Sequence, residues 1–252
     1  MKVNRKNSKT ELISLKVQNK MSISIGGLQK NSLIDYPGLV SCIIFCNGCN
    51  FRCGFCHNKD LVLPDKRREI KQEKIFDFLK KRQGLIDGVV VTGGEPTIYK
   101  SLPDFFKKIK DLGYLLKLDT NGTSPDMLKQ LIKKDLVDFI AMDIKASFEN
   151  YSKAAGVEDI NVENIKKSIE IIKGFDNHEF RTTVVPGIVN KEEIKKIGEI
   201  VKGAKKHALQ QFRPKNTLKK EFSELKPFKK DKLKEFKKIL DKQVIKCVIR
   251  GT

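Results

Sequence analysis

The feature that most constrains the fold is a regular alternation of short apolar runs and amphipathic segments, which begins at Ser41 and continues to the C-terminus. The apolar runs predict buried strands over 41–46, 88–91, 114–118, 137–142, 180–185, 207–212 and 243–249. The amphipathic segments predict helices over 72–82, 102–112, 125–133, 162–173, 192–202 and 230–240. Ser124 and Asn161 stand where the third and fourth helices need an N-cap. This alternation predicts βαβ units in an α/β fold with a parallel sheet, and six units favour a partial (β/α)6 TIM-like barrel.

The length of 252 residues suits one barrel domain, which we expect to span residues 21–252. Residues 1–20 are polar, basic and aperiodic, and they predict a disordered extension. The sequence has no apolar run of 18 residues, so we expect no membrane span. Residues 1–20 also lack the apolar stretch of a secretory signal. A cytoplasmic location is the resulting expectation.

Lys and Arg number 51 against 31 for Asp and Glu, which gives a formal charge of +20. Such an excess attracts polyanions, so nucleic-acid binding is a possible function. Lysines spread over helical segments are more often a solvated surface, and the chain has no Trp for base stacking. The segment 215–238, with ten Lys against four acids, favours a solvated face over a docking surface for the same reason.

The cysteines are crowded: five of the six fall between positions 42 and 56. A disulfide framework would spread its cysteines along a small secreted chain, so the crowding indicates metal. Three of them, Cys49, Cys53 and Cys56, have the spacing C-x3-C-x2-C. Three thiolates on one short loop would leave one iron of a four-iron cluster without a protein ligand and open to a cofactor or substrate.

Zinc is the competing interpretation, because Cys46, Cys49, Cys53 and Cys56 can be paired as two C-x2-C units. The three residues between those pairs are too few for the usual zinc-knuckle geometry. A zinc site would also leave the Gly93–Pro96 run unexplained. We expect Cys42, Cys46 and Cys247 to be buried packing residues on strands.

Polar motifs follow five successive predicted strands, at the point where each strand ends. After the cysteine loop come Gly93-Gly94-Glu95-Pro96, then Asp119-Thr120-Asn121-Gly122, then Asp143 with Lys145, and then Pro186-Gly187. Barrel enzymes build their sites from the loops at the C-terminal ends of the strands. The sequence therefore predicts one site at this rim.

The cysteine motif, continued by His57 and Asn58, resembles the radical S-adenosylmethionine (SAM) superfamily, and the Gly93–Pro96 run resembles its second hallmark. The segments GGLQK at 26–30 and LIDYPG at 33–38 resemble the branch of glycyl-radical activases, in particular anaerobic ribonucleoside-triphosphate reductase activating proteins. The resemblance covers residues 21 to 214.

The resemblance implies a barrel of the radical SAM type with one [4Fe-4S] cluster, held by Cys49, Cys53 and Cys56, and SAM bound at its open iron. Reductive cleavage of SAM would release a 5′-deoxyadenosyl radical, which would take a hydrogen atom from a backbone glycine of a partner. The implied partner is a glycyl-radical enzyme, such as the large subunit of anaerobic ribonucleotide reductase. The implied electron donor is a flavodoxin or ferredoxin.

The same resemblance suggests roles for the polar rim. Phe55 would pack near the adenine, and Gly93 and Gly94 would let the backbone approach the methionine ammonium group. Further expected cofactor contacts are Glu95 and Pro96, which fix the turn, Asp119 and Asp143, which share a cation or contact SAM, and Lys145, which pairs with the SAM carboxylate.

Two other functions remain open. A radical SAM enzyme that modifies a small molecule or a tRNA would also fit the motifs and the positive charge. A zinc-containing nucleic-acid-binding module without catalysis is the interpretation from another class, and metal analysis distinguishes it from both enzymes.

Overall fold

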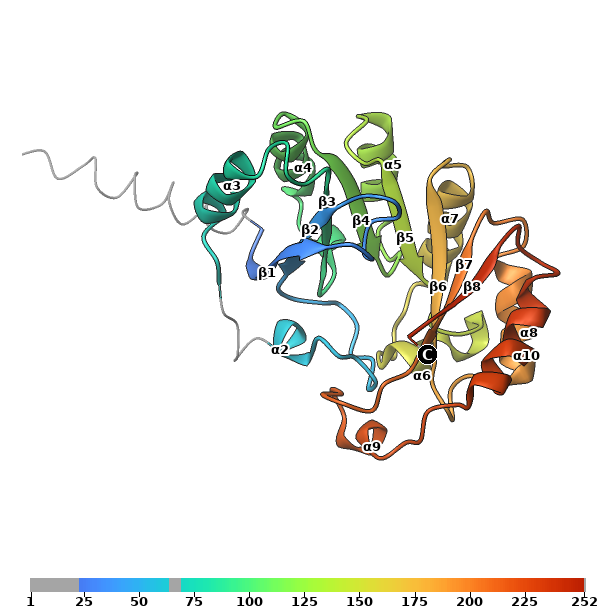
Figure 1. The fold of residues 1–252 in the computed structure, drawn as a ribbon. Helices are drawn as coiled ribbons and strands as arrows, with labels where there is room; N and C mark the ends of the chain where they lie inside the picture. The colour runs from blue at the N-terminus through green and yellow to red at the C-terminus, as the bar shows by residue number, and fades with distance from the viewer. Residues whose placement is uncertain (1–22, 64–68, 252) are drawn as a thin grey trace, which may run out of the picture.

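The computed structural model describes residues 23–63 and 69–251, so the expected extension 1–20 lies outside the described residues. Within these ranges eight strands form one sheet in sequence order (Figure 1). The strands are β1 (Ile25–Ser32), β2 (Ser41–Cys46), β3 (Gly88–Gly93), β4 (Leu115–Thr120), β5 (Phe139–Asp143), β6 (His178–Val184), β7 (His207–Gln211) and β8 (Cys247–Arg250). Strands β2 to β8 pair in parallel, as predicted.

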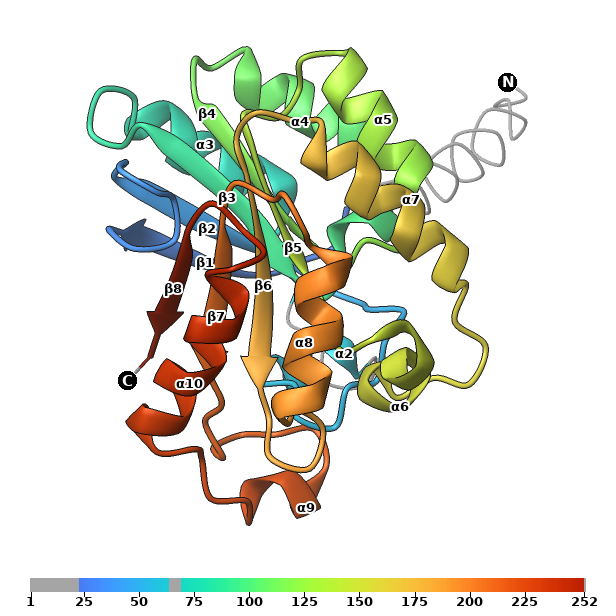
Figure 2. The same ribbon diagram turned by 90° about the vertical axis from the view of Figure 1, so that its right-hand side faces the viewer.

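Six helices connect the successive parallel strands, and Figures 1 and 2 show them along the outer face of the sheet. They are α3 (Gln72–Lys81), α4 (Leu102–Lys110), α5 (Pro125–Lys133), α7 (Val162–Lys173), α8 (Lys191–Ile200) and α10 (Lys230–Leu240). The sheet is open, with β1 and β8 at its two edges. The prediction of an α/β fold with a partial (β/α)6 barrel is confirmed.

Shorter helices lie in the loops: α2 (Lys59–Val62), α6 (Tyr151–Ala155), α9 (Lys220–Ser223) and the 3-10 turns η2 (Pro96–Ile98) and η3 (Phe148–Asn150). These pieces are too short to show a helical period, which is why the sequence pattern missed them.

Strand β1 was also missed, and it runs antiparallel to β2. Its central residues are partly or fully exposed, so it lacks the continuous apolar run that revealed the other strands. The predicted last strand, 243–249, in fact begins at Cys247. Gln243 and Val244 instead close the end of α10, where both amides donate to the carbonyl oxygen of Leu240.

Of the two predicted N-caps, only one forms a hydrogen bond. Asn161 caps α7, since its side chain accepts a hydrogen bond from the amide of Asn164 at 3.1 Å. Ser124 stands at the N-cap position of α5, but its side chain makes no capping hydrogen bond, so that part of the prediction was wrong.

The main core lies between the sheet and the helices, and it extends from Ile23 to Cys247 in the chain. A second, smaller cluster joins Tyr36 to Ile43 and Val90, with Phe139 packed against it. Tyr36 comes from the loop between β1 and β2, and its ring lies 6.1 Å from that of Phe139. No helix of the described residues is long and apolar enough to cross a membrane.

Candidate active site

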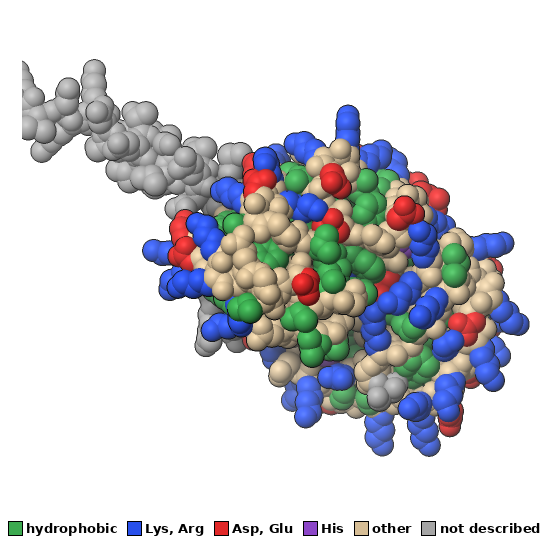
Figure 3. Space-filling model, turned by 45° about the horizontal axis from the view of Figure 1, so that its top comes forward, with side chains coloured by type: hydrophobic (Ala, Val, Ile, Leu, Met, Phe, Trp, Pro, Cys, Tyr) green, Lys and Arg blue, Asp and Glu red, His purple; other side chains and the backbone are tan. Residues whose placement is uncertain are grey.

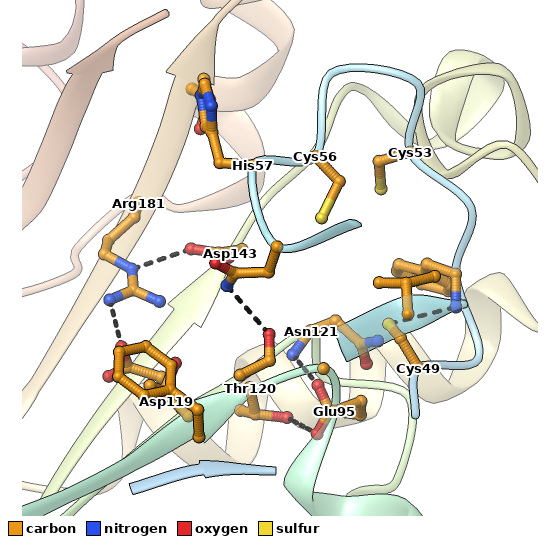
Figure 4. A pocket seen from close by; sticks show the side chains of 18 of the residues that line it. Cys49, Cys53, Cys56, His57, Glu95, Asp119, Thr120, Asn121, Asp143 and Arg181 are labelled. Carbon is orange, nitrogen blue, oxygen red and sulfur yellow. Dashed lines mark hydrogen bonds and ion pairs between the residues drawn. The ribbon is translucent and has the colours of Figure 1, made fainter. Parts of the chain in front are cut away.

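A cavity of about 380 Å³ lies at the C-terminal ends of the parallel strands, where the polar motifs were expected to meet (Figure 4). This volume is within the range of small-molecule sites. The cavity is lined by residues from every one of these motifs except Pro186-Gly187: Cys49, Cys53, Phe55, Cys56, His57, Asn58, Gly93, Gly94, Glu95, Asp119, Thr120, Asn121, Asp143 and Lys145. Arg181, which belongs to none of the motifs, also lines it.

The cysteine loop follows β2 and is fixed by backbone hydrogen bonds to distant segments. The amide of Gly48 donates to the carbonyl of Leu61, and that of Arg52 donates to Ala155 at the end of α6. In Figure 4 the thiols of Cys53 and Cys56 point inward from the loop above the cavity, and that of Cys49 lies to its lower right. All three are free thiols.

Burial raises the pKa of these thiols, to about 12 for Cys49 and about 11 for Cys53. The nearby Lys145 ammonium acts in the opposite direction on both. Without a metal the loop therefore holds neutral thiols, and thiolates form when a metal supplies the compensating charge.

These observations fit an iron–sulfur cluster, because three soft sulfur donors from one loop converge on a cavity of sufficient size. In the part of the chain that the structure describes, no three His, Cys, Asp or Glu side chains are grouped to hold a single metal ion. A four-iron cluster makes no such demand, since each thiolate binds a different iron.

The Gly93–Pro96 turn packs directly on the backbone that leads into the cysteine loop. A Cβ atom on Gly94 would lie 1.8 Å from the carbonyl oxygen of Gly48, and Gly93 has a φ of +115°. The amide of Glu95 donates to the same Gly48 oxygen at 2.8 Å. The two glycines are therefore required by this close backbone packing.

The buried Glu95 carboxylate ties two loops together. It accepts hydrogen bonds from the amide and hydroxyl of Thr97 at 3.1 and 2.6 Å, from the Thr120 hydroxyl at 2.8 Å and from the Asn121 amide at 2.6 Å. Burial raises the pKa of Glu95, and these hydrogen bonds oppose the rise. Since both oxygens are engaged, Glu95 positions the rim of the cavity more than it offers a free ligand.

Asn121 extends this connection to the cysteine loop. Its amide nitrogen Nδ2 donates to Asn50 Oδ1 at 2.8 Å, and Asn50 in turn donates to the Thr123 hydroxyl at 2.8 Å. The cysteine loop, the Gly93–Pro96 turn and the loop after β4 thus form one hydrogen-bonded unit.

A series of largely buried ion pairs crosses strands β4, β5 and β6 beside this unit. The Arg181 guanidinium on β6 lies between two carboxylates, 2.8 Å from Asp119 Oδ2 and 2.8 Å from Asp143 Oδ1. Lys117 pairs with the other oxygen of Asp119 at 2.8 Å, and Lys145 with the other oxygen of Asp143 at 3.0 Å.

In this series of ion pairs, the effect of charge pairing on the pKa values outweighs the effect of burial. Burial by itself would raise the pKa of Asp143, but Arg181 and Lys145 lower it well below its usual range. Burial would likewise lower the pKa of Lys145, but Asp143 raises it. Asp119, Asp143, Lys145 and Arg181 are therefore charged at neutral pH.

The structure brings most predicted site residues together. Phe55 is buried beside the cavity, with its ring 6.1 Å from that of Phe222. Pro96 is buried at the start of η2 and does not line the cavity. Cys42, Cys46 and Cys247 are buried on strands β2 and β8.

Arg181 is the site residue that sequence reasoning missed. Its guanidinium lies between Asp119 and Asp143, the two carboxylates that were expected either to share a cation or to contact SAM. The available indication was a charged residue inside the predicted buried strand 180–185, where burial without a partner would be unfavourable.

Comparison with known proteins agrees with this geometry. The model of the radical SAM superfamily matches residues 43–201. A protein of Methanocaldococcus jannaschii, named as a candidate glycyl-radical enzyme activating enzyme, is 36% identical over 91% of this chain and 97% of its own length. A pyruvate formate-lyase-activating enzyme of Clostridium pasteurianum is 27% identical over 62% of this chain and 78% of its own.

A solved structure shares the fold. Streptococcus suis SuiB bound to S-adenosylmethionine superposes with a TM-score of 0.60 and 15% identity, over 81% of this chain and 48% of that one. The family model covers more than half of the chain, and it includes the strands and loops that build the cavity. The chain belongs to the radical SAM superfamily.

Proposed function

We propose that this chain binds a [4Fe-4S] cluster through Cys49, Cys53 and Cys56, cleaves SAM reductively, and generates a glycyl radical on a partner protein. The observation that carries the proposal is the convergence of the three thiols and the polar rim on one cavity. Similarity to a candidate glycyl-radical activating enzyme along 91% of the chain supports the choice of a protein partner.

When bound, the cluster would supply one electron for reductive cleavage of a carbon–sulfur bond of SAM to methionine and a 5′-deoxyadenosyl radical, which would leave as 5′-deoxyadenosine after taking a hydrogen atom from the partner's glycine. The barrel contributes binding, orientation and exclusion of water.

The residues of this chain divide these tasks. The three cysteines hold the cluster, and Phe55 offers apolar surface for the adenine. Lys145 and Arg181 face the cavity with donors suited to the SAM carboxylate, while Asp119 and Asp143 keep both cations in place. Gly93, Gly94, Glu95 and Pro96 shape the edge that receives the methionine part.

The test is anaerobic purification followed by metal analysis and a SAM cleavage assay with a chemical reductant. We expect about four irons per chain and formation of 5′-deoxyadenosine. Cys53→Ala should abolish both, whereas Cys247→Ala, at a buried position on β8, should retain both. Stoichiometric zinc without SAM cleavage would overturn the proposal.

The partner is tested separately. Incubation of the reduced protein and SAM with the large subunit of an anaerobic ribonucleotide reductase should give the electron paramagnetic resonance doublet of a glycyl radical. SAM cleavage without any radical on glycyl-radical enzymes, together with strongly salt-dependent tRNA binding, would instead support the RNA-modifying alternative.

A further inference from the structure

The segment 213–229, here called the strap, lies against the outer side of the cysteine loop. It contains α9, which Figures 1 and 2 show at the end of the molecule that carries this loop. The amide of Lys219 donates to the carbonyl of Gly54 at 2.9 Å, and His57 Nδ1 lies 3.0 Å from the carbonyl of Lys215. The strap is therefore fixed to the loop through its backbone.

Side-chain packing strengthens this attachment. A Cβ atom on Gly54 would lie 2.2 Å from the Phe222 ring, so the glycine allows that ring to pack directly on the loop. The same ring packs edge-on against Phe55. Gly54 and Phe55 separate Cys53 from Cys56, so the strap lies next to the proposed cluster ligands.

The strap carries basic side chains that have no acidic partner. It has six basic residues against two acidic ones, Glu221 and Glu224. All six are exposed, and none forms an ion pair within the described part of the chain: Arg213, Lys215, Lys219, Lys220, Lys226 and Lys229.

Basic residues are common on this surface, so their number alone is not specific. Figure 3 shows Lys and Arg around most of the outline of the molecule. Many of the helix lysines are neutralised by an acid three or four residues away, as in the pairs Lys166–Glu163 and Lys237–Asp241. The strap is distinguished by its position, because its unpaired basic side chains lie on the segment that packs against the cysteine loop.

The proposed reaction, on which this inference rests, consumes one electron for every SAM molecule cleaved. Electron transfer between proteins weakens steeply with distance, so a donor must dock on the surface nearest the cluster. Redox encounters use small interfaces that are guided by complementary charge. We propose that the strap is the docking surface for an acidic one-electron carrier protein of the flavodoxin or ferredoxin kind.

The test compares two triple variants with equal changes of charge. The strap variant reverses three charges of the strap, through Lys219→Glu, Lys220→Glu and Lys226→Glu. The α5 variant reverses three charges at exposed positions on and just after α5, through Lys129→Glu, Lys133→Glu and Lys134→Glu. Each variant, loaded with its cluster, is assayed for SAM cleavage with reduced flavodoxin, with reduced ferredoxin and with dithionite.

With at least one protein donor, the strap variant should cleave SAM about tenfold more slowly than the wild type at low salt, and the difference should shrink as salt is raised. With dithionite the rates should agree within about twofold, and the α5 variant should keep most of its rate with every donor. Equal rates of the two variants with both protein donors would overturn the proposal.

Two further outcomes separate this proposal from the function itself. If the wild type cleaves no SAM with dithionite, the proposed function fails, and calorimetric binding of flavodoxin and ferredoxin to the two variants still decides the role of the strap. If the strap variant loses salt-sensitive binding of tRNA but keeps its reduction by both carriers, the strap is an RNA surface and the docking proposal is wrong.

Discussion

At the scale of single residues, the Gly93–Pro96 motif is explained by packing before any ligand is considered. Gly94 lies so close to the Gly48 carbonyl that no side chain fits, and the contact joins the turn to the start of the cysteine loop. Glu95 then connects the same turn to Thr120 and Asn121. A short motif thus aligns three loops around the cavity.

Substitution of Gly94 tests this explanation. Gly94→Ala should lower the free energy of unfolding by about 1–3 kcal/mol, because a Cβ atom 1.8 Å from the Gly48 carbonyl oxygen forces the backbone to move. Urea unfolding measures the change. Gly174→Ala is the control, since its Cβ would meet atoms at ordinary distances of 3.5 Å or more and its φ is −77°. Equal stability of the two variants would contradict the packing argument.

At the scale of elements, asparagine side chains stabilise the starts of two helices, α7 and α8. Asn161 and Asn190 accept hydrogen bonds from Asn164 and Glu193, at the starts of α7 and α8. Ser124 has the right position before α5 but makes no such bond. A suitable residue type at an N-cap position therefore does not establish the cap, because the side-chain rotamer depends on its surroundings.

Asn161 and Ser124 give a matched pair of variants, one with a capping bond and one without. Asn161→Ala should reduce the free energy of unfolding by about 1 kcal/mol, because the Asn164 amide loses its side-chain acceptor and keeps only the backbone carbonyl of Asn161. Ser124→Ala removes no capping bond and should stay within about 0.5 kcal/mol of the wild type. Chemical denaturation of both variants distinguishes them, and a larger loss for Ser124→Ala would refute this account.

At the scale of the whole molecule, buried charges connect the two ends of the barrel. Lys117 is nearly fully buried, and it donates to the backbone carbonyl of Asp35 at 2.7 Å and pairs with Asp119. From Asp119 the series of ion pairs continues through Arg181 and Asp143 to Lys145 beside the cysteines. The loop after β1 is thereby linked to the candidate active site.

Substitution of Lys117 tests how much this series of ion pairs contributes to the free energy of unfolding. Lys117→Met leaves Asp119 buried with one cation fewer, and we expect a loss of about 3–5 kcal/mol in the free energy of unfolding. Lys107→Met, which breaks an exposed pair with Asp111, should cost less than about 1 kcal/mol. Comparable losses in the two variants, measured by urea titration, would show that burial of the Lys117–Asp119 pair is unimportant.

The sequence by itself determined the parallel strands, the main helices and the position of the motifs at the strand ends. Each of these depends on local periodicity or on the chain order of a βαβ unit, which neighbouring residues specify. The tertiary structure decided the antiparallel pairing of β1, the place of Arg181 between Asp119 and Asp143, and the packing of the strap on Gly54. These contacts join residues far apart in the chain, and they depend on strand register and burial, which no local pattern records.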